Sequence, residues 1–280
     1  MSVAVEKVLW LIEHRYGEEL TLDAMAEHIG VSRFHLSRSF PAATGMSISA
    51  YLRGRRLTEA AKALAAGAPD ILSVALDATY GSHEAFTRAF RDQFDITPEQ
   101  VRLRGSTRDL RLVEPIRIDE SLFVPLAPPR FVDVPPLLLA GLMELHPCDK
   151  PERVPAQWQR FTPFIEHMPN ATGMAAYGVL THLFDGGDSF QYFTAVQVTS
   201  LAGLHEELTA IRMPAQRYAV FQHEGHVSRM RPTVHSIFNR DVERYGIDTA
   251  EMPSFVEYYG PDFDVAGGEG DIEIWVPVKA

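Results

Sequence analysis

Arg38 and Arg88 occupy the same place in two copies of one short pattern, fifty residues apart. Each copy begins with serine, at Ser32 and Ser82, and carries its arginine six residues later. An arginine can donate two hydrogen bonds to the O6 and N7 atoms of a guanine in the major groove of DNA. A repeat that preserves such a side chain therefore indicates a surface used twice, and base recognition is the chemistry that it favours.

Both copies have the spacing of an amphipathic helix. Leu36 and Phe40 in the first copy, and Phe86 and Phe90 in the second, lie four residues apart, one helical turn, after a serine suited to cap the helix. These side chains should enter a core and leave a polar face outside. Two such helices held about 34 Å apart would enter successive major grooves. The candidate contacts to DNA are Arg33, Phe34, Ser37, Arg38, His83, Glu84, Thr87 and Arg88. The alternative is a pair of ordinary helices with solvated faces.

The elements around these helices fit a helix-turn-helix arrangement. Apolar spacing predicts a supporting helix after Thr21, and Gly30 supplies a tight turn into the first copy. A long helix is expected from about Ser47 to Ala66, and a second supporting helix from Ile71. The long helix could hold two helix-turn-helix units at a fixed separation.

At this point the sequence resembles the AraC/XylS family of DNA-binding domains, over about residues 5–104. The segments that carry the resemblance are Arg38-Ser39-Phe40, Thr44-Gly45-Met46-Ser47, Arg56-Leu57 with Ala60-Ala61, Ile71, Ala75, and Phe86-Thr87-Arg88-Ala89-Phe90 with Thr97-Pro98. The resemblance implies an all-α, homeodomain-like double helix-turn-helix fold with double-stranded DNA as its partner. It also implies groove contacts from Phe34, Ser37 and Arg38 and from His83, Glu84 and Arg88.

Three residues depart from the family pattern. Pro41 replaces a usual basic residue and, lacking an N–H, is expected to end the first recognition helix early. Thr79 and Asp95 replace two usual glycines. Asp tolerates a left-handed backbone moderately well and Thr poorly, so we expect the turn geometry around the second unit, and not the fold, to differ from that of the family.

Charge is distributed unevenly along the chain. The net charge is −11, but residues 1–111 hold 14 Lys and Arg against 14 Asp and Glu, so the remaining residues carry the whole excess. Residues 31–62 are locally basic, which suits phosphate binding. The single cysteine, Cys148, excludes an intrachain disulfide and fits a reducing compartment. No metal site, cofactor, signal peptide or membrane span is expected, and a cytoplasmic location is predicted.

A second internal repeat begins near Arg130, at a spacing of roughly 80 residues. Val134-Pro135-Pro136 parallels Met213-Pro214-Ala215, and each is followed by a predicted helix, at 155–168 and 226–245. Each half predicts strand–helix–strand–strand, an α+β unit. We therefore expect three segments: a DNA-binding domain over 1–108, a proline-rich linker with some strand character over 109–129, and a second domain over 130–280 of two pseudo-symmetric halves. A small ligand would suit the cleft between those halves.

The second domain resembles the GyrI-like family of effector-binding domains, through its duplicated pattern, Trp158, Glu257 and the closing Gly268-Glu269-Gly270-Asp271-Ile272-Glu273-Ile274-Trp275. The resemblance implies that it binds hydrophobic, often cationic, small molecules. Glu257 would be the pocket anion, with cation–π contacts around it. The candidate ligand contacts are Trp158, Phe161, Tyr177, Tyr218, Phe221, Phe255, Glu257 and Tyr259. For each aromatic residue alone, plain core packing is the alternative.

Together these features predict a transcription regulator, not an enzyme, that responds to a small organic effector. The effector would alter either DNA affinity or contact with RNA polymerase. Two alternatives stay open. In the first, the second domain hydrolyses a reactive small molecule, with Glu257 and a nearby tyrosine as acid and base. In the second, the protein sequesters drugs and its DNA-binding domain is vestigial.

Overall fold

The computed structural model describes residues 3–116, 123–147, 153–183 and 189–279. The chain forms two compact units. We call Ala4–Arg33 with Ile48–Ile118 the helical unit, and Phe34–Ser47 with Asp119–Ala280 the effector unit. The first recognition helix thus belongs to the same unit as the C-terminal sheet, and the second belongs to the helical unit. Each unit is described separately.

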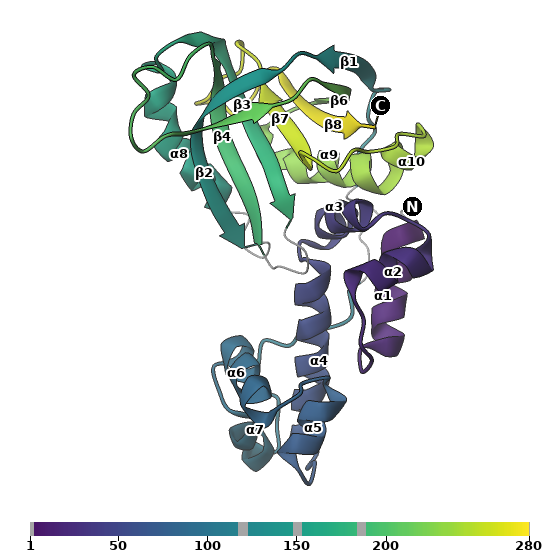
Figure 1. Ribbon diagram of the computed structural model, residues 1–280. Helices are drawn as coiled ribbons and strands as arrows, with labels where there is room; N and C mark the ends of the chain where they lie inside the picture. Colours follow the sequence, from purple (N-terminus) through teal and green to yellow (C-terminus); the bar gives the residue numbers. More distant parts are fainter. Residues whose placement is uncertain (1–2, 117–122, 148–152, 184–188, 280) are drawn as a thin grey trace. The chain divides into compact units, whose positions relative to one another are not determined.

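The helical unit is built around one long helix. Its elements are α1 (Val3–Arg15), α2 (Leu22–Ile29), α4 (Ile48–Ala65), α5 (Ile71–Asp77), α6 (His83–Phe94) and α7 (Pro98–Arg104). Figure 1 shows α5, α6 and α7 gathered around the C-terminal part of α4. Leu57, Ala61 and Leu64 on one face of α4 pack with Phe86 and Phe90 of α6, as the apolar spacing predicted.

The ends of these helices follow from local sequence. Thr21, Asp70, Ser82 and Thr97 each cap a helix by accepting a backbone N–H with their side chain. The two positions where glycine was expected do take the left-handed backbone: φ is 66° at Thr79 and 59° at Asp95. The turns around the second helix-turn-helix unit therefore form in spite of residues that disfavour this conformation.

The described part of the effector unit contains one eight-stranded antiparallel sheet, in the order β1-β6-β8-β7-β3-β4-β2-β5. The strands are β1 (Arg130–Val134), β2 (Leu137–Pro147), β3 (Ala171–Leu183), β4 (Ser189–Val198), β5 (Thr209–Met213), β6 (Gln216–His223), β7 (Phe255–Tyr259) and β8 (Ile272–Val278). If β1, β2, β3 and β4 are exchanged with β5, β6, β7 and β8, the strand order becomes the same order read backwards. The pseudo-two-fold axis therefore passes between β3 and β7.

Each half of the sheet contains one strand more than the sequence predicted. The pattern is strand–strand–helix–strand–strand, because β1 and β2 are separated at Pro135-Pro136 and β5 and β6 at Pro214-Ala215. These prolines, which interrupt one apolar run in each half, mark the breaks between the paired strands. The described part of the linker contains no strand before Arg130.

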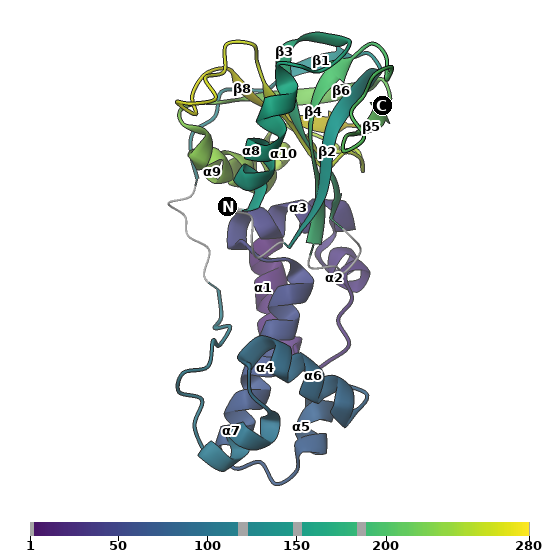
Figure 2. The same ribbon diagram turned by 90° about the vertical axis from the view of Figure 1, so that its left-hand side faces the viewer.

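One face of the sheet is covered by helices. They are α8 (Val154–Ile165), η3 (Val227–Arg229), α9 (Met230–Ser236), the π-helical stretch η4 (Ile237–Asp241) and α10 (Val242–Arg244). Figure 2 shows α8, α9 and α10 together on one side of the strands. Phe161 of α8 packs with Tyr259, and Phe238 of η4 packs with Phe221. The opposite face has its own cluster, which includes Tyr177, Tyr218 and Trp275.

The first recognition helix, α3 (Arg33–Thr44), continues past Pro41, contrary to the expected early end. Gly45 follows it with φ of 77°, and its N–H donates to the Pro41 carbonyl at 2.8 Å. The helix therefore tolerates the proline in its last turn.

Candidate DNA-binding and effector sites

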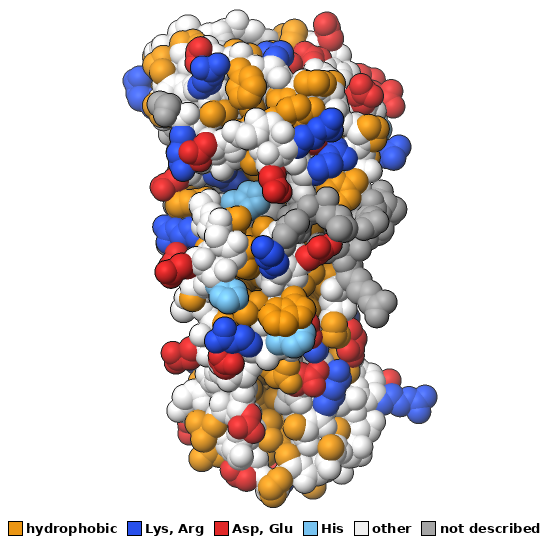
Figure 3. Space-filling view, turned by 90° about the vertical axis from the view of Figure 1, so that its right-hand side faces the viewer, with side chains coloured by type: hydrophobic (Ala, Val, Ile, Leu, Met, Phe, Trp, Pro, Cys, Tyr) orange, Lys and Arg blue, Asp and Glu red, His pale blue; other side chains and the backbone are white. Residues whose placement is uncertain are grey.

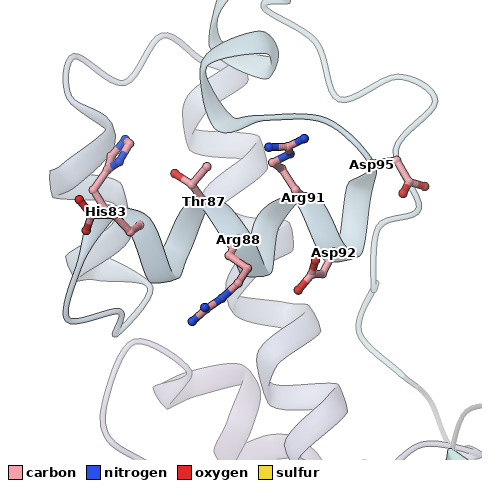
Figure 4. Close-up of a pocket in the computed structure, with 7 residues that line it drawn as sticks. His83, Thr87, Arg88, Arg91, Asp92 and Asp95 are labelled. Carbon is pink, nitrogen blue, oxygen red and sulfur yellow. The ribbon is translucent and has the colours of Figure 1, made fainter.

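The four candidate residues of the second recognition helix lie together. His83, Glu84, Thr87 and Arg88 line an open groove of about 590 Å³ on α6, with Arg91, Asp92 and Asp95. Figure 4 shows His83, Thr87 and Arg91 projecting to one side of the helix and Arg88 to the other. The Thr87 hydroxyl is enclosed and has no hydrogen-bond partner among the described residues. Arg88 is exposed, and an exposed arginine suits contact with base edges.

Glu84 differs in role from its neighbours in this groove. Its pKa is lowered, first by its own backbone amide and then by the Ser82 hydroxyl. A carboxylate held at the first turn stabilises the helix N-terminus. Because these donors already occupy Glu84, its geometry supports helix capping more than contact with a base. The groove also carries the negative charges of Asp92 and Asp95, so phosphate attraction there depends on Arg88 and Arg91.

The candidates on α3 have a different environment. Arg33 keeps 37% of its side-chain surface exposed and lies 3.9 Å from Asp23. The Ser37 hydroxyl donates to the Phe34 carbonyl at 3.0 Å. Arg38 is only 4% exposed, and its guanidinium donates to two carbonyls of the effector unit. Arg38 therefore does not project into solvent in this structure, unlike Arg88.

The locally basic segment 31–62 is largely engaged within the helical unit. Arg55 is buried and bonds Glu13, Glu59 and the Val113 carbonyl. Arg56 donates to two carbonyls near the end of α1, at Tyr16 and Glu18. Lys62 pairs with Glu59 and Glu114. These cations are thus less available to phosphate than the sequence suggested. Figure 3 likewise shows acidic and basic side chains interspersed on the face in view.

The effector unit holds a carboxylate among aromatic side chains beside its pseudo-two-fold axis. Glu257 of β7 accepts hydrogen bonds from the hydroxyls of Tyr192 and Tyr259, the second at 2.9 Å. Trp158 of α8 donates its indole N–H to the Tyr192 hydroxyl at 3.1 Å. The Trp158 and Tyr259 rings meet edge to face with centroids 5.0 Å apart. We call Trp158, Tyr192, Glu257 and Tyr259 the Glu257 cluster.

Burial sets the electrostatics of this cluster. It raises the pKa of Glu257, because the ionised form loses hydration, and the two tyrosine hydroxyls only partly offset the effect. Burial also raises the pKa of Tyr192 and Tyr259 well above their ordinary value. No Lys, Arg or His among the described residues pairs with Glu257. Glu257 nevertheless keeps part of its surface accessible to solvent.

The remaining predicted ligand contacts are divided between the two faces of the sheet. Phe255 lies on the same face of β7 as Glu257, and Phe161 packs against Tyr259. Phe221 belongs to the neighbouring cluster under η4. Tyr177 and Tyr218 lie on the opposite face with Tyr258 and Trp275. The structure therefore does not place Tyr177 and Tyr218 beside Glu257, because Tyr177 pairs in register with Tyr258.

Tyr192 was missed by the sequence analysis. It lies on β4, two strands from Glu257, and only the register of β3 brings the two together. Gly178 of β3 is the cross-strand partner of Glu257. A Cβ atom at Gly178 would overlap the Tyr192 hydroxyl and lie 2.8 Å from a Glu257 carboxylate oxygen. The absent side chain at Gly178 makes room for the hydrogen bond between them.

Replacing Gly178 with alanine should therefore disrupt the cluster. We expect Gly178→Ala to lower the free energy of unfolding by about 1–3 kcal/mol through overpacking. Gly173→Ala on the same strand is the matched control, since nothing lies within 4 Å of a Cβ atom there. Urea unfolding of the two variants measures the difference. Equal stability would show that Gly178 is not required for this packing.

The comparisons with known proteins identify the family of each domain. The model of the GyrI-like small molecule binding domain matches residues 127–279, more than half of the chain. The chain belongs to the GyrI-like family. A helix-turn-helix domain model matches residues 25–104, and the combination is that of an AraC-type DNA-binding transcriptional regulator with a GyrI-like effector-binding domain.

Several known proteins are similar to all or part of this AraC-type regulator. The transcriptional regulator Rob of Salmonella typhimurium is 27% identical over 284 residues, which span 97% of this chain and 96% of Rob. The multiple antibiotic resistance protein MarA of Escherichia coli K12 is 30% identical over 115 residues, 41% of this chain and 91% of MarA. A solved structure of SAV2435 bound to tetraphenylphosphonium is 21% identical, covers 54% of this chain and 93% of that chain, and superposes with a TM-score of 0.46.

The described residues of the regulator contain neither a metal-site cluster nor a helix able to cross a membrane. No group of three or more His, Cys, Asp or Glu side chains there has the geometry of a metal site. No described helix is both long and apolar enough to span a membrane.

Proposed function

We propose that the effector of this regulator is a lipophilic aromatic cation that binds at the Glu257 cluster. The observation that carries the proposal is a carboxylate surrounded by aromatic rings whose partners are two tyrosine hydroxyls and no basic side chain of the described chain. An enclosed carboxylate without a counter-ion is costly to ionise. A cation from outside would supply that counter-ion, and the Trp158 and Tyr259 rings would add cation–π contacts.

A pair of probes of equal shape and opposite charge tests this proposal. Tetraphenylphosphonium and tetraphenylborate present the same four phenyl rings, so apolar contact alone would bind both. We expect isothermal titration to detect binding of the phosphonium cation and not of the borate anion. Equal affinity for both ions would contradict a site organised by Glu257.

Binding of the cation should depend on pH. The cation requires ionised Glu257, and burial raises the pKa of this group above its ordinary value of 4.5. Affinity should therefore fall as pH drops through the raised pKa, at a higher pH than an exposed carboxylate would give. Titrations from pH 5 to pH 8 with the same probe measure the midpoint. A flat profile over this range would count against ionisation of Glu257 as the source of affinity.

We further propose that both recognition helices contact DNA. On α6, His83, Thr87 and Arg88 would enter one major groove, supported by their shared exposed groove. On α3, Arg33, Phe34, Ser37 and Arg38 would enter the next. The two helices carry their arginines at equivalent positions of the internal repeat, which supports equivalent roles.

One feature of the cluster favours hydrolysis as a second candidate function. The Tyr192 hydroxyl donates directly to Glu257, so a base and a proton donor are already in contact. Turnover of a reactive electrophile, lost in Glu257→Gln and retained in Gly173→Ala, would support this function. We propose that the cluster binds its ligand without turning it over. The expected result is therefore that no product forms when the test compound saturates the protein.

A further inference from the structure

We propose that the effector unit carries a docking surface for α3, and that this surface competes with DNA for Arg38. The docking surface consists of Arg231, Phe238, Asn239, Glu243, Ala250 and Glu251. The inference rests on the proposed function, because it concerns the regulation of a helix that we assign to DNA recognition. When α3 is docked, its main base-contacting side chain is withheld from the groove.

Hydrogen bonds and a cation–π contact join α3 to the centre of the docking surface. Arg38 donates from one guanidinium nitrogen to the Ala250 carbonyl at 2.8 Å and to the Glu251 carbonyl at 2.7 Å. Its guanidinium carbon lies 6.0 Å from the centroid of the Phe238 ring. The Asn239 amide donates to the Ser39 backbone carbonyl at 3.0 Å in a fully buried bond. The surface therefore engages both the side chain of Arg38 and the backbone of its neighbour.

Two further pairs lie beside these contacts. The charge of Glu243 acts on His35 and partly offsets the lowering of its pKa by burial and by Arg38. A Cβ atom at Gly45, just past the end of α3, would lie 3.1 Å from the Arg231 guanidinium. The docking surface therefore acts on α3 electrostatically at its first turn and lies close to the residue that follows the helix.

The docked state leaves polar atoms unsatisfied. Two of the guanidinium nitrogens of Arg38, the Ser39 hydroxyl and the Asn239 amide oxygen are buried without a partner among the described residues. Burial lowers the pKa of Arg38 to about 10, although the charge of Glu251 opposes the effect. A buried charge with unfilled donors is costly. Guanine O6 and N7 or a phosphate would fill those donors, so DNA can compete for the same side chain.

The docking surface also lies next to the proposed effector site. Phe238 and Asn239 belong to the π-helical stretch η4, a local form that is frequent at functional sites. The Phe238 ring lies 5.8 Å from the Phe255 ring, and Phe255 shares a face of β7 with Glu257. A cation that separates the side chains around Glu257 would displace Phe255, then Phe238, and so loosen the contact to Arg38. Effector binding should therefore release α3.

Weakening the surface tests the competition. Asn239→Ala removes the donor to Ser39 without altering any residue proposed to touch DNA. We expect it to tighten binding to a duplex selected from random sequence by about 5–10-fold, the lower part of the usual range of coupling between sites. Gln222→Ala is the matched control, because Gln222 of β6 donates through its amide to the Ile272 carbonyl of β8, outside the docking surface. Unchanged or weaker DNA binding in folded Asn239→Ala would overturn the proposal.

Locking the contact tests it in the opposite direction. His35→Cys with Glu243→Cys, in a Cys148→Ser background, allows a short bis-maleimide with a disulfide spacer to join α3 to the docking surface. The linked protein should lose specific DNA binding at least 10-fold, and reduction of the spacer should restore it. Equal binding before and after cleavage would overturn the proposal. If Arg38→Ala leaves DNA affinity unchanged in the Asn239→Ala background, where the docking contact is already weakened, the assignment of α3 to DNA fails instead, so the two failures can be told apart.

Discussion

Arg88→Ala and Arg38→Ala should each weaken binding to the selected duplex by about 1–3 kcal/mol, the discrimination expected of one arginine paired with guanine. Arg88 should show the simpler effect, because it is exposed on α6 and outside the docking surface. Arg38→Ala removes both a base contact and a docking contact, so its net loss should lie nearer the lower end of the range. Fluorescence anisotropy with labelled duplex measures both.

Arg104→Ala is the control for charge alone. It removes one exposed positive charge from the C-terminal turn of α7, away from the groove on α6. Its loss should be small and equal for specific and scrambled duplexes, since phosphate contacts do not depend on sequence. If Arg88→Ala also weakens both duplexes equally, α6 contributes phosphate attraction and not base recognition.

Glu257→Gln should reduce affinity for tetraphenylphosphonium at least 10-fold, or about 1.4 kcal/mol, because the cation loses its only proposed counter-charge. Glu273→Gln is an informative control. Glu273 also lies among aromatic rings, but on the opposite face of the sheet, where Arg130 pairs with it and Trp275 donates to it at 2.8 Å. Unchanged affinity in Glu273→Gln would assign the probe to the helix-covered face. The reverse result would move the site to the face that carries Tyr177 and Tyr218.

Glu257→Gln should also stabilise the unliganded protein. A carboxyl group whose folded pKa is raised contributes most to stability when protonated, and loses that contribution as pH rises through the folded pKa. Above the ordinary pKa of a glutamate the folded state therefore bears a cost at Glu257, either for burying the ionised carboxylate or for holding a proton on it, which a neutral glutamine avoids. Thermal unfolding at pH 7 should show a higher midpoint in Glu257→Gln, and the difference should shrink toward pH 4.

Much of the helical unit could be predicted from local sequence. The N-caps at Thr21 and Ser82, the apolar face of α4 and the repeat itself depend on residues that are neighbours in the chain. In the effector unit, local sequence also predicted α8, which begins at Val154 where a helix from residue 155 was expected. Pro41 was misjudged, because α3 continues through it to Thr44 and gives up only the one backbone hydrogen bond that proline cannot donate.

The parts that could not be predicted depend on contacts distant in sequence. Whether Tyr177 or Gly178 faces Glu257 is decided by strand register, and a shift of one residue reverses every side chain. Tyr192 on β4 reaches Glu257 on β7 only because β3 lies between these two strands and has a glycine at the crossing point. Arg38 looked like Arg88 in the sequence, and only the fold shows that carbonyls more than 200 residues away accept its hydrogen bonds.

The most direct test of this account is the effect of tetraphenylphosphonium on DNA affinity in the full chain. The labelled duplex is titrated with protein in the presence and absence of saturating cation, in the native sequence and in Glu257→Gln. We predict binding about 5-fold tighter or more with the cation in the native protein, a typical coupling between two sites, and no change in Glu257→Gln. An unchanged DNA affinity in the native protein, at cation concentrations shown to fill the site, would contradict the account.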